Sequence, residues 1–105
     1  MVQALIYLVT NAVEAIADAA GRHIKVVAED AGHAVEFVVW DSGGGVPEPL
    51  RESVFEPFFT TKDEDHLGLG LALARRVARL HDGGLCYEPE RGFVMRLPKN
   101  NGAAQ

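Results

Sequence analysis

The sequence has few cysteines, no long basic run and no long apolar run, and each shortage excludes a class of protein. Its single cysteine, Cys86, rules out an internal disulfide and provides no cysteine cluster for a metal. One cysteine also fits a reduced, cytoplasmic setting. No apolar run approaches the roughly 20 residues of a bilayer-spanning helix, so we expect no direct membrane insertion. The net charge of −5 leaves no basic face, which argues against a nucleic-acid partner.

What remains is the composition of one globular domain. The chain has 105 residues, of which 48% are hydrophobic and 24% are charged, enough for a single core. The last residues, 99–105, are small and polar, so we expect a domain over 3–98 and a disordered tail. The chain starts directly in a helical pattern, and we therefore expect it to be part of a longer protein.

Hydrophobic periodicity predicts the elements. Apolar residues recur at helical spacing from residue 3 to about residue 20, and again over 68–80. β-branched and apolar runs predict strands over 24–29, 34–40, 85–88 and 93–97, and a short helix is possible over 50–54. The strands follow one another in hairpins. We therefore expect an α/β (α+β) two-layer sandwich, with a mainly antiparallel sheet and both long helices on one face.

A glycine-rich turn follows the second predicted strand directly. Asp41 ends that strand, and its carboxylate could accept a hydrogen bond from an amine such as that of adenine. Gly43 and Gly45 would let the backbone approach a flat base closely. The alternative is structural: Asp41 would cap the turn that begins at Ser42, and the glycines would form a flexible loop.

Three further features suggest phosphate and metal binding. The run Gly68–Leu71 opens a helix, whose free N–H groups and positive dipole favour phosphate. Asn11 offers an amide oxygen to Mg²⁺, which takes few protein ligands and relies on phosphate oxygens and waters. Lys62 could neutralise a phosphate. The alternatives are a helix start packed on the sheet, an amide satisfied by backbone and a solvated loop lysine.

The order of these motifs resembles that of the catalytic, ATP-binding domain of bacterial sensor histidine kinases, in the ATPase superfamily shared with gyrase, Hsp90 and MutL. The matching segments are Asn11–Ala15 (the N box), Asp41–Pro47 (the G1 box), Phe55–Lys62 (the F box) and Gly68–Ala74 with His81–Gly84 (the G2 box). The F box is most similar to that of kinases of the nitrogen-regulation type.

The resemblance implies a Bergerat-type fold and ATP and Mg²⁺ as cofactors. It implies that the γ-phosphate goes to a histidine on a separate dimerisation and phosphoacceptor domain, so the isolated chain should not autophosphorylate. A response regulator receiver domain would be the second partner, and the parent protein can be membrane-anchored. Asn11 would bind the metal, and the implied nucleotide-binding residues are Asn11, Ala15, Asp41, Gly43, Gly45, Val46, Thr61, Lys62, Leu67, Gly68, Leu69, Gly70 and Leu71.

Departures from the family pattern define the alternatives. Tyr7 stands where ATP hydrolases of the superfamily place a glutamate base, which argues against a hydrolase. His66 and Leu67 replace the residues that usually open the G2 box, and the lid between Thr60 and Leu67 is short. Glu14 would repel phosphate unless Mg²⁺ intervenes. A degenerate module is therefore the alternative, a binding or scaffold domain with weak or no nucleotide binding.

Overall fold

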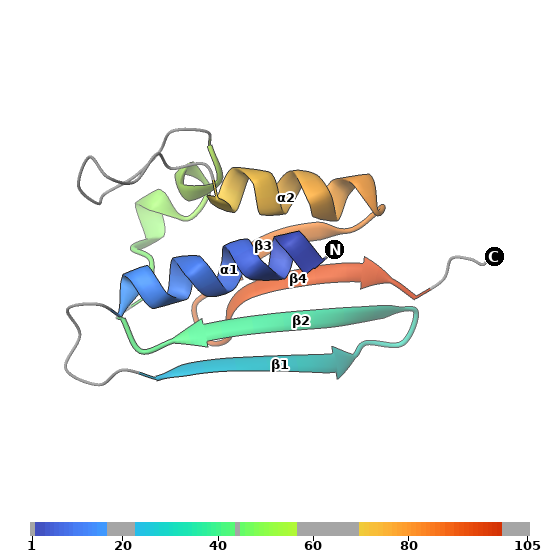
Figure 1. Ribbon diagram of the computed structural model, residues 1–105, viewed down its shortest axis with the longest axis horizontal. Coiled ribbons are helices and arrows are strands. Elements are labelled where there is room, and N and C mark those ends of the chain that lie inside the picture. Colours follow the sequence, from blue (N-terminus) through green and yellow to red (C-terminus); the bar gives the residue numbers. More distant parts are fainter. Residues whose placement is uncertain (1, 17–22, 44, 57–69, 100–105) are drawn as a thin grey trace.

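The computed structural model describes residues 2–16, 23–43, 45–56 and 70–99. Two α-helices, four strands and two 3-10 helices lie in these ranges (Figure 1). In chain order they are α1 (Val2–Ala15), β1 (Ile24–Asp30), β2 (Ala34–Asp41), η1 (Glu48–Leu50), η2 (Ser53–Phe55), α2 (Gly70–Leu80), β3 (Gly84–Glu88) and β4 (Gly92–Pro98).

Two hairpins build the sheet. The strand order is β1-β2-β4-β3, and every pairing among the described strands is antiparallel. The first hairpin turns at Gly32, whose positive φ of 83° suits glycine and whose N–H donates to Asp30 Oδ1 at 2.9 Å. The hairpins meet where β2 pairs with β4, with Val38 opposite Val94. This pairing brings residues more than fifty positions apart into one sheet.

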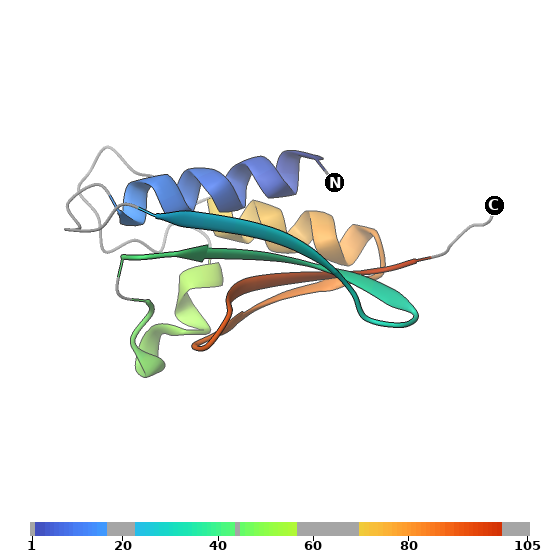
Figure 2. The ribbon, with the colours of Figure 1, turned by 90° about the horizontal axis from the view of Figure 1, so that it is seen from below.

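Both helices lie side by side on the same face of the sheet, as Figures 1 and 2 show from two directions. The predicted two-layer sandwich is confirmed. The first helix ends at Ala15 rather than near residue 20, because Ile16 is already in a turn, and residues 17–22 lie outside the described residues. The predicted short helix over 50–54 is instead a pair of 3-10 helices on either side of Arg51 and Glu52.

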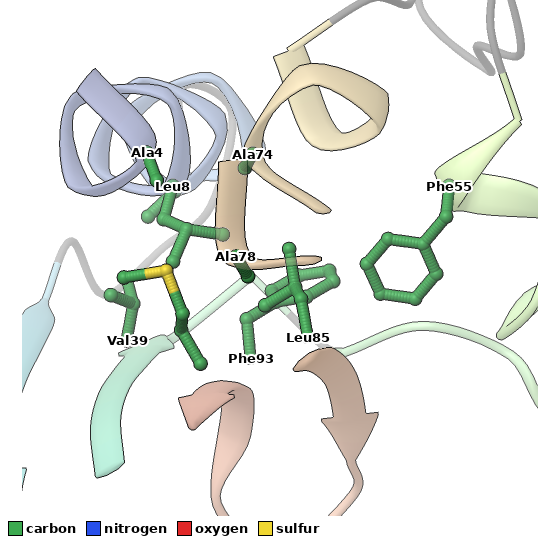
Figure 3. Close-up of a cluster of buried hydrophobic side chains, with 10 residues drawn as sticks. Ala4, Leu8, Val39, Phe55, Ala74, Ala78, Leu85 and Phe93 are labelled. Atoms are coloured by element: carbon green, nitrogen blue, oxygen red, sulfur yellow. The ribbon is translucent and has the colours of Figure 1, made fainter. Parts of the chain in front are cut away.

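Alanines form much of the contact between the two helices. Ala4 and Ala12 of α1 and Ala74 and Ala78 of α2 are buried, and their small side chains let the helices approach closely. Leu8, fully buried on α1, is the large side chain in this layer (Figure 3). From the sheet, the core is completed by Val39, Leu85, Phe93 and Met95.

The 3-10 segment η2 is fastened to both layers. Phe55 is 5% exposed and meets Phe93 edge to face, with ring centroids 5.9 Å apart. The Arg75 guanidinium of α2 lies 4.3 Å from the centre of the Phe55 ring and binds Glu52 at 3.2 Å. Phe55, the first residue of the F box, thus belongs to the hydrophobic core, whereas Phe58 and Phe59 lie outside the described residues.

A charged network covers the sheet face that the helices leave open. Arg91 binds Glu29, Glu36 and Glu88 at 2.5, 2.7 and 3.2 Å, and Arg96 also binds Glu36 at 3.0 Å. The hydrogen bond from Arg91 holds the pKa of Glu36 below its usual value. These pairs link β1, β2 and β4 across the outer face. Within the described ranges, no helix has the length and hydrophobicity that a membrane span requires.

Candidate functional site

One end of the sandwich carries a pocket of about 690 Å³. It is formed where the last turn of α1, the end of β2, the start of α2 and the turn between β3 and β4 come together, at the left in Figure 1. The segment Gly45–Val54, with both 3-10 helices, forms its remaining side. This volume is in the range of sites for small molecules and cofactors. The antiparallel topology therefore brings the ends of five elements to one cavity.

Six of the residues predicted to bind nucleotide line this pocket: Asn11, Asp41, Gly43, Gly45, Val46 and Leu71. Two others lie on elements that border it, because Ala15 is the last residue of α1 and Gly70 is the first residue of α2. The remaining five, Thr61, Lys62, Leu67, Gly68 and Leu69, lie outside the described residues. The structure thus brings the N box, the G1 box and the described end of the G2 box to one place.

The orientation of Asp41 is set by the turn that follows it. Its Oδ1 accepts a hydrogen bond from the N–H of Gly43 at 2.8 Å, which is the turn-capping arrangement weighed as the structural alternative. The Ser42 Oγ accepts from the N–H of His23 at 3.0 Å and ties the turn to the start of β1. Capping uses one carboxylate oxygen of Asp41. No described residue donates to Oδ2, so the same side chain can both shape the turn and accept a hydrogen bond from a ligand.

Two further residues of the pocket, which no sequence motif indicated, bind the end of this turn. Tyr87 of β3 accepts a hydrogen bond from the N–H of Val46 at 3.1 Å, and Arg51 Nε donates to the carbonyl oxygen of Val46 at 3.0 Å. The Arg51 guanidinium also lies 5.5 Å from the centre of the Tyr87 ring. Neither residue is part of a recognisable sequence motif. Tyr87 is 41 positions from Val46, so only the fold brings the two together.

Two side chains of α1 that carry oxygen atoms line the pocket opposite the turn after β2. Asn11 and Glu14 are three positions apart, so they lie on one face of the helix, and both line the pocket. Amide and carboxylate oxygens suit Mg²⁺. Within the described ranges, no group of three or more His, Cys, Asp or Glu side chains could hold a metal by itself. A cation at Asn11 would therefore need oxygens from a bound ligand, as a nucleotide phosphate provides.

Tyr7 does not take part in this wall. It is half-buried, packs against the hydrophobic core and is not among the pocket-lining residues. Its Cβ would lie 4.0 Å from a Cβ placed on Gly70. The position that hydrolases of the superfamily use for a general base is thus filled by a packing residue.

Comparison with known proteins gives a consistent family assignment. Residues 1–101 match the model of the histidine kinase-, DNA gyrase B- and HSP90-like ATPase family. Among curated proteins, the C4-dicarboxylate transport sensor protein DctB of Rhizobium meliloti is 42% identical over 102 residues, and DctS of Rhodobacter capsulatus is 36% identical over 102 residues. The aligned parts cover 92% and 91% of this chain but only 16% and 15% of those relatives.

Solved structures of histidine kinases have the same fold. The nucleotide-free catalytic domain of the histidine kinase ThkA is 40% identical, with a TM-score of 0.79, and the match covers 92% of this chain and 64% of that one. Full-length ShkA in complex with AMPPNP is 30% identical, with a TM-score of 0.75 and coverage of 91% and 20%. ThkA in complex with the response regulator protein TrrA is 38% identical, with a TM-score of 0.73 and coverage of 93% and 28%.

These relatives do not support the finer resemblance to kinases of the nitrogen-regulation type, since they include sensors of C4-dicarboxylate transport and other sensor kinases. They agree on the coarser assignment. The extent of the family match, the relatives and the shared fold lead to one conclusion. The chain belongs to the histidine kinase-, DNA gyrase B- and HSP90-like ATPase family, as a catalytic domain of the sensor histidine kinase type.

Proposed function

We propose that this domain binds Mg-ATP in the pocket described above and delivers the γ-phosphate to a histidine on a separate dimerisation and phosphoacceptor domain. The observation that carries the proposal is the convergence of Asn11 and Asp41 with Gly43, Gly45 and Val46 on one cavity. Each of these features has a structural explanation when taken alone. Their meeting in one cavity of suitable volume is what a nucleotide site requires.

The base end of the site would be formed by Asp41 and the glycine turn. Oδ2 of Asp41 would accept a hydrogen bond from the exocyclic amine of adenine, while Oδ1 continues to hold the turn. Val46, Leu71 and Phe93 offer apolar surface to the ring. The relative ShkA was solved with AMPPNP, an ATP analogue, which supports ATP as the ligand class.

The phosphate end would depend on Asn11 and a magnesium ion. Mg²⁺ would neutralise the phosphates and would also separate them from the Glu14 carboxylate, which lines the same part of α1. Lys62 and the segment Leu67–Leu71 remain the proposed contacts to the phosphates, together with Ala15 and Thr61. Catalysis would come mainly from positioning and charge neutralisation, as in phosphoryl transfer generally.

Phosphoryl transfer from this site would require partner domains. No histidine is among the described residues that line the pocket, and we propose that transfer needs a second domain, the dimerisation and phosphoacceptor domain of a longer cytoplasmic-facing kinase. The complex of ThkA with TrrA supports a response regulator receiver domain as the next partner. With a separate acceptor domain and labelled ATP, label should appear on the acceptor. Labelling of this isolated chain would contradict the proposal.

Calorimetric titration with ADP and Mg²⁺ tests nucleotide binding directly. Asp41→Asn keeps an oxygen that can accept from the Gly43 N–H but replaces the second oxygen with an amide donor, which faces the donor of adenine. We expect the dissociation constant to rise at least about ten-fold, the size of one hydrogen bond to a charged group.

Asp30→Asn is the matched control. Asp30 makes the same turn-capping hydrogen bond, to Gly32 at 2.9 Å, but at the far hairpin and away from the pocket. It should bind ADP like the parent. Absence of saturable binding by the parent would favour the scaffold alternative. Equal binding by the parent and Asp41→Asn would reject the pocket as the adenine site.

A further inference from the structure

We infer that Tyr87 and Arg51 are positioning residues of the nucleotide site, which hold the Val46 peptide from both sides and keep the glycine turn in its binding shape. The inference rests on the proposed function, because it assigns these residues to the site where the nucleotide would bind. Neither residue belongs to the four sequence motifs, so this role goes beyond what the motifs indicate.

Both backbone polar groups of Val46, its N–H and its carbonyl oxygen, are bound by side chains. Its N–H donates to Tyr87 Oη at 3.1 Å, and its carbonyl oxygen accepts from Arg51 Nε at 3.0 Å. Both bonds are partly buried, so losing either partner would leave a backbone group poorly satisfied. The turn from Asp41 thus has one anchor at its start, the Gly43–Asp41 bond, and two at its end.

The position of the Tyr87 hydroxyl is determined by the sheet and not by the turn. Tyr87 lies opposite Phe93 in the β3–β4 ladder, and the two rings pack edge to face with centroids 5.1 Å apart. Arg51 covers the other side, with its guanidinium 5.5 Å from the Tyr87 ring centre. The Tyr87 side chain, held in place by the second hairpin, therefore fixes the end of the turn that follows β2.

Gly45 fits this arrangement closely. Its φ is +79°, and a Cβ added there would lie 2.5 Å from Tyr87 Oη but 3.8 Å from Tyr87 Cζ. The first distance is a clash and the second is an ordinary contact. The hydroxyl of Tyr87 thus needs a glycine at position 45 for space as well as for backbone conformation.

The consequence for function is preorganisation. A turn that already holds its bound shape does not have to be ordered by the ligand, so less of the binding energy is consumed. Without the Tyr87 hydroxyl, the turn could adopt other conformations in the free protein. The nucleotide would then have to select or restore the binding shape, and the dissociation constant would rise.

The test uses Tyr87→Phe and Arg51→Met, which keep the ring and the aliphatic stem but remove the groups that bind Val46. ADP titration with Mg²⁺ should show binding weakened about five-fold in Tyr87→Phe, the size expected for one neutral hydrogen bond that orders a site. Arg51→Met should weaken it at least as much, because the bond that it removes is donated by a charged guanidinium. In the ligand-free protein, exchange of the Val46 amide hydrogen should become faster in Tyr87→Phe than in the parent.

A double-mutant cycle isolates the contact itself. Gly45→Ala should weaken ADP binding strongly in the parent and less in the Tyr87→Phe background, where the clash is absent. Gly32→Ala is the control for backbone strain, because Gly32 also has a positive φ, of 83°, but has nothing within 4 Å of an added Cβ. It should leave ADP affinity unchanged.

The outcomes separate this inference from the proposed function. If the parent binds ADP and both Tyr87→Phe and Arg51→Met bind it equally well, the positioning role is wrong and the nucleotide site stands. If Gly45→Ala weakens ADP binding equally in the parent and in the Tyr87→Phe background, the contact between Tyr87 and position 45 does not shape the turn. If the parent binds no ADP while its Val46 amide is protected, the proposed function fails, and the contact is structural only.

Discussion

Replacing Leu8 by alanine tests how the helical layer is held on the sheet. Leu8 is fully buried on α1, one helical turn from Ala4 and from Ala12, and belongs to the same core cluster as Ala74 and Ala78 of α2. Figure 3 shows Leu8 together with Ala4, Ala74 and Ala78. The four alanines cannot fill the space that Leu8 leaves, so only larger side chains of the sheet in the same core, such as Met95, can move toward it. The substitution should therefore leave a cavity that closes only in part.

The expected cost is about 3 kcal/mol in the free energy of unfolding, near the lower end for Leu→Ala at sites that collapse poorly. In a domain of this size that would lower the melting temperature by about 15 °C. The matched control is Ile6→Ala on the same helix, where the side chain is 55% exposed. Its lost burial is partly offset by the better helix propensity of alanine, so we expect a change within about 1 kcal/mol.

Urea unfolding followed by circular dichroism measures both variants under identical conditions. The reasoning is refuted if Ile6→Ala costs as much as Leu8→Ala, because the exposed face of α1 would then be as tightly packed as its buried face. At low temperature, where Leu8→Ala is still folded, ADP affinity should stay close to that of the parent. A large loss of affinity would show that Leu8 also determines the position of Asn11 one turn later.

Two further predictions concern charged side chains. The Arg91 hydrogen bond holds the pKa of Glu36 below its reference value of 4.5, so this contribution to stability is present above about pH 4.5 and is lost as the pH falls through the folded-state pKa. Glu36→Gln should therefore reduce the loss of unfolding free energy between neutral pH and about pH 3, and an unchanged acid dependence would contradict this. Arg75→Met removes the cation–π contact with η2 and should cost about 1 kcal/mol by urea unfolding. Arg76→Met, on the exposed side of α2, should be close to neutral, and equal effects would reject the contact.

Hydrophobic spacing was enough to predict the elements and the layers, because a buried helix face and a half-buried strand each impose a local period. The apolar positions 4, 8 and 12 repeat at helical spacing and do form the buried stripe of α1. The ends were harder to predict. The pattern continued past Ala15, but the helix ends there, and the region around Arg51 and Glu52 forms 3-10 helices beside two prolines that lack a backbone donor.

Some residues of the candidate site could be predicted from the sequence and others could not. The order of the motifs predicted Asn11, Asp41 and Gly45 as members of one site, and the fold brings all three to one cavity. Tyr87 and Arg51 were not predicted, because neither has a distinctive local pattern. The hydrogen bond between Tyr87 and Val46 depends on how the second hairpin packs, whereas Arg51 reaches Val46 within one loop segment.

The sequence alone therefore determined the fold class, the family and the residue types at the glycine turn after β2, because these depend on local spacing and on motif order. Only the tertiary structure decided how the turn is held. It showed that Asp41 gives one oxygen to the turn and that Tyr87 reaches Val46 from the other hairpin. The physical reason is that a side-chain hydrogen bond over 41 residues depends on the sheet register and helix packing that place its two ends together.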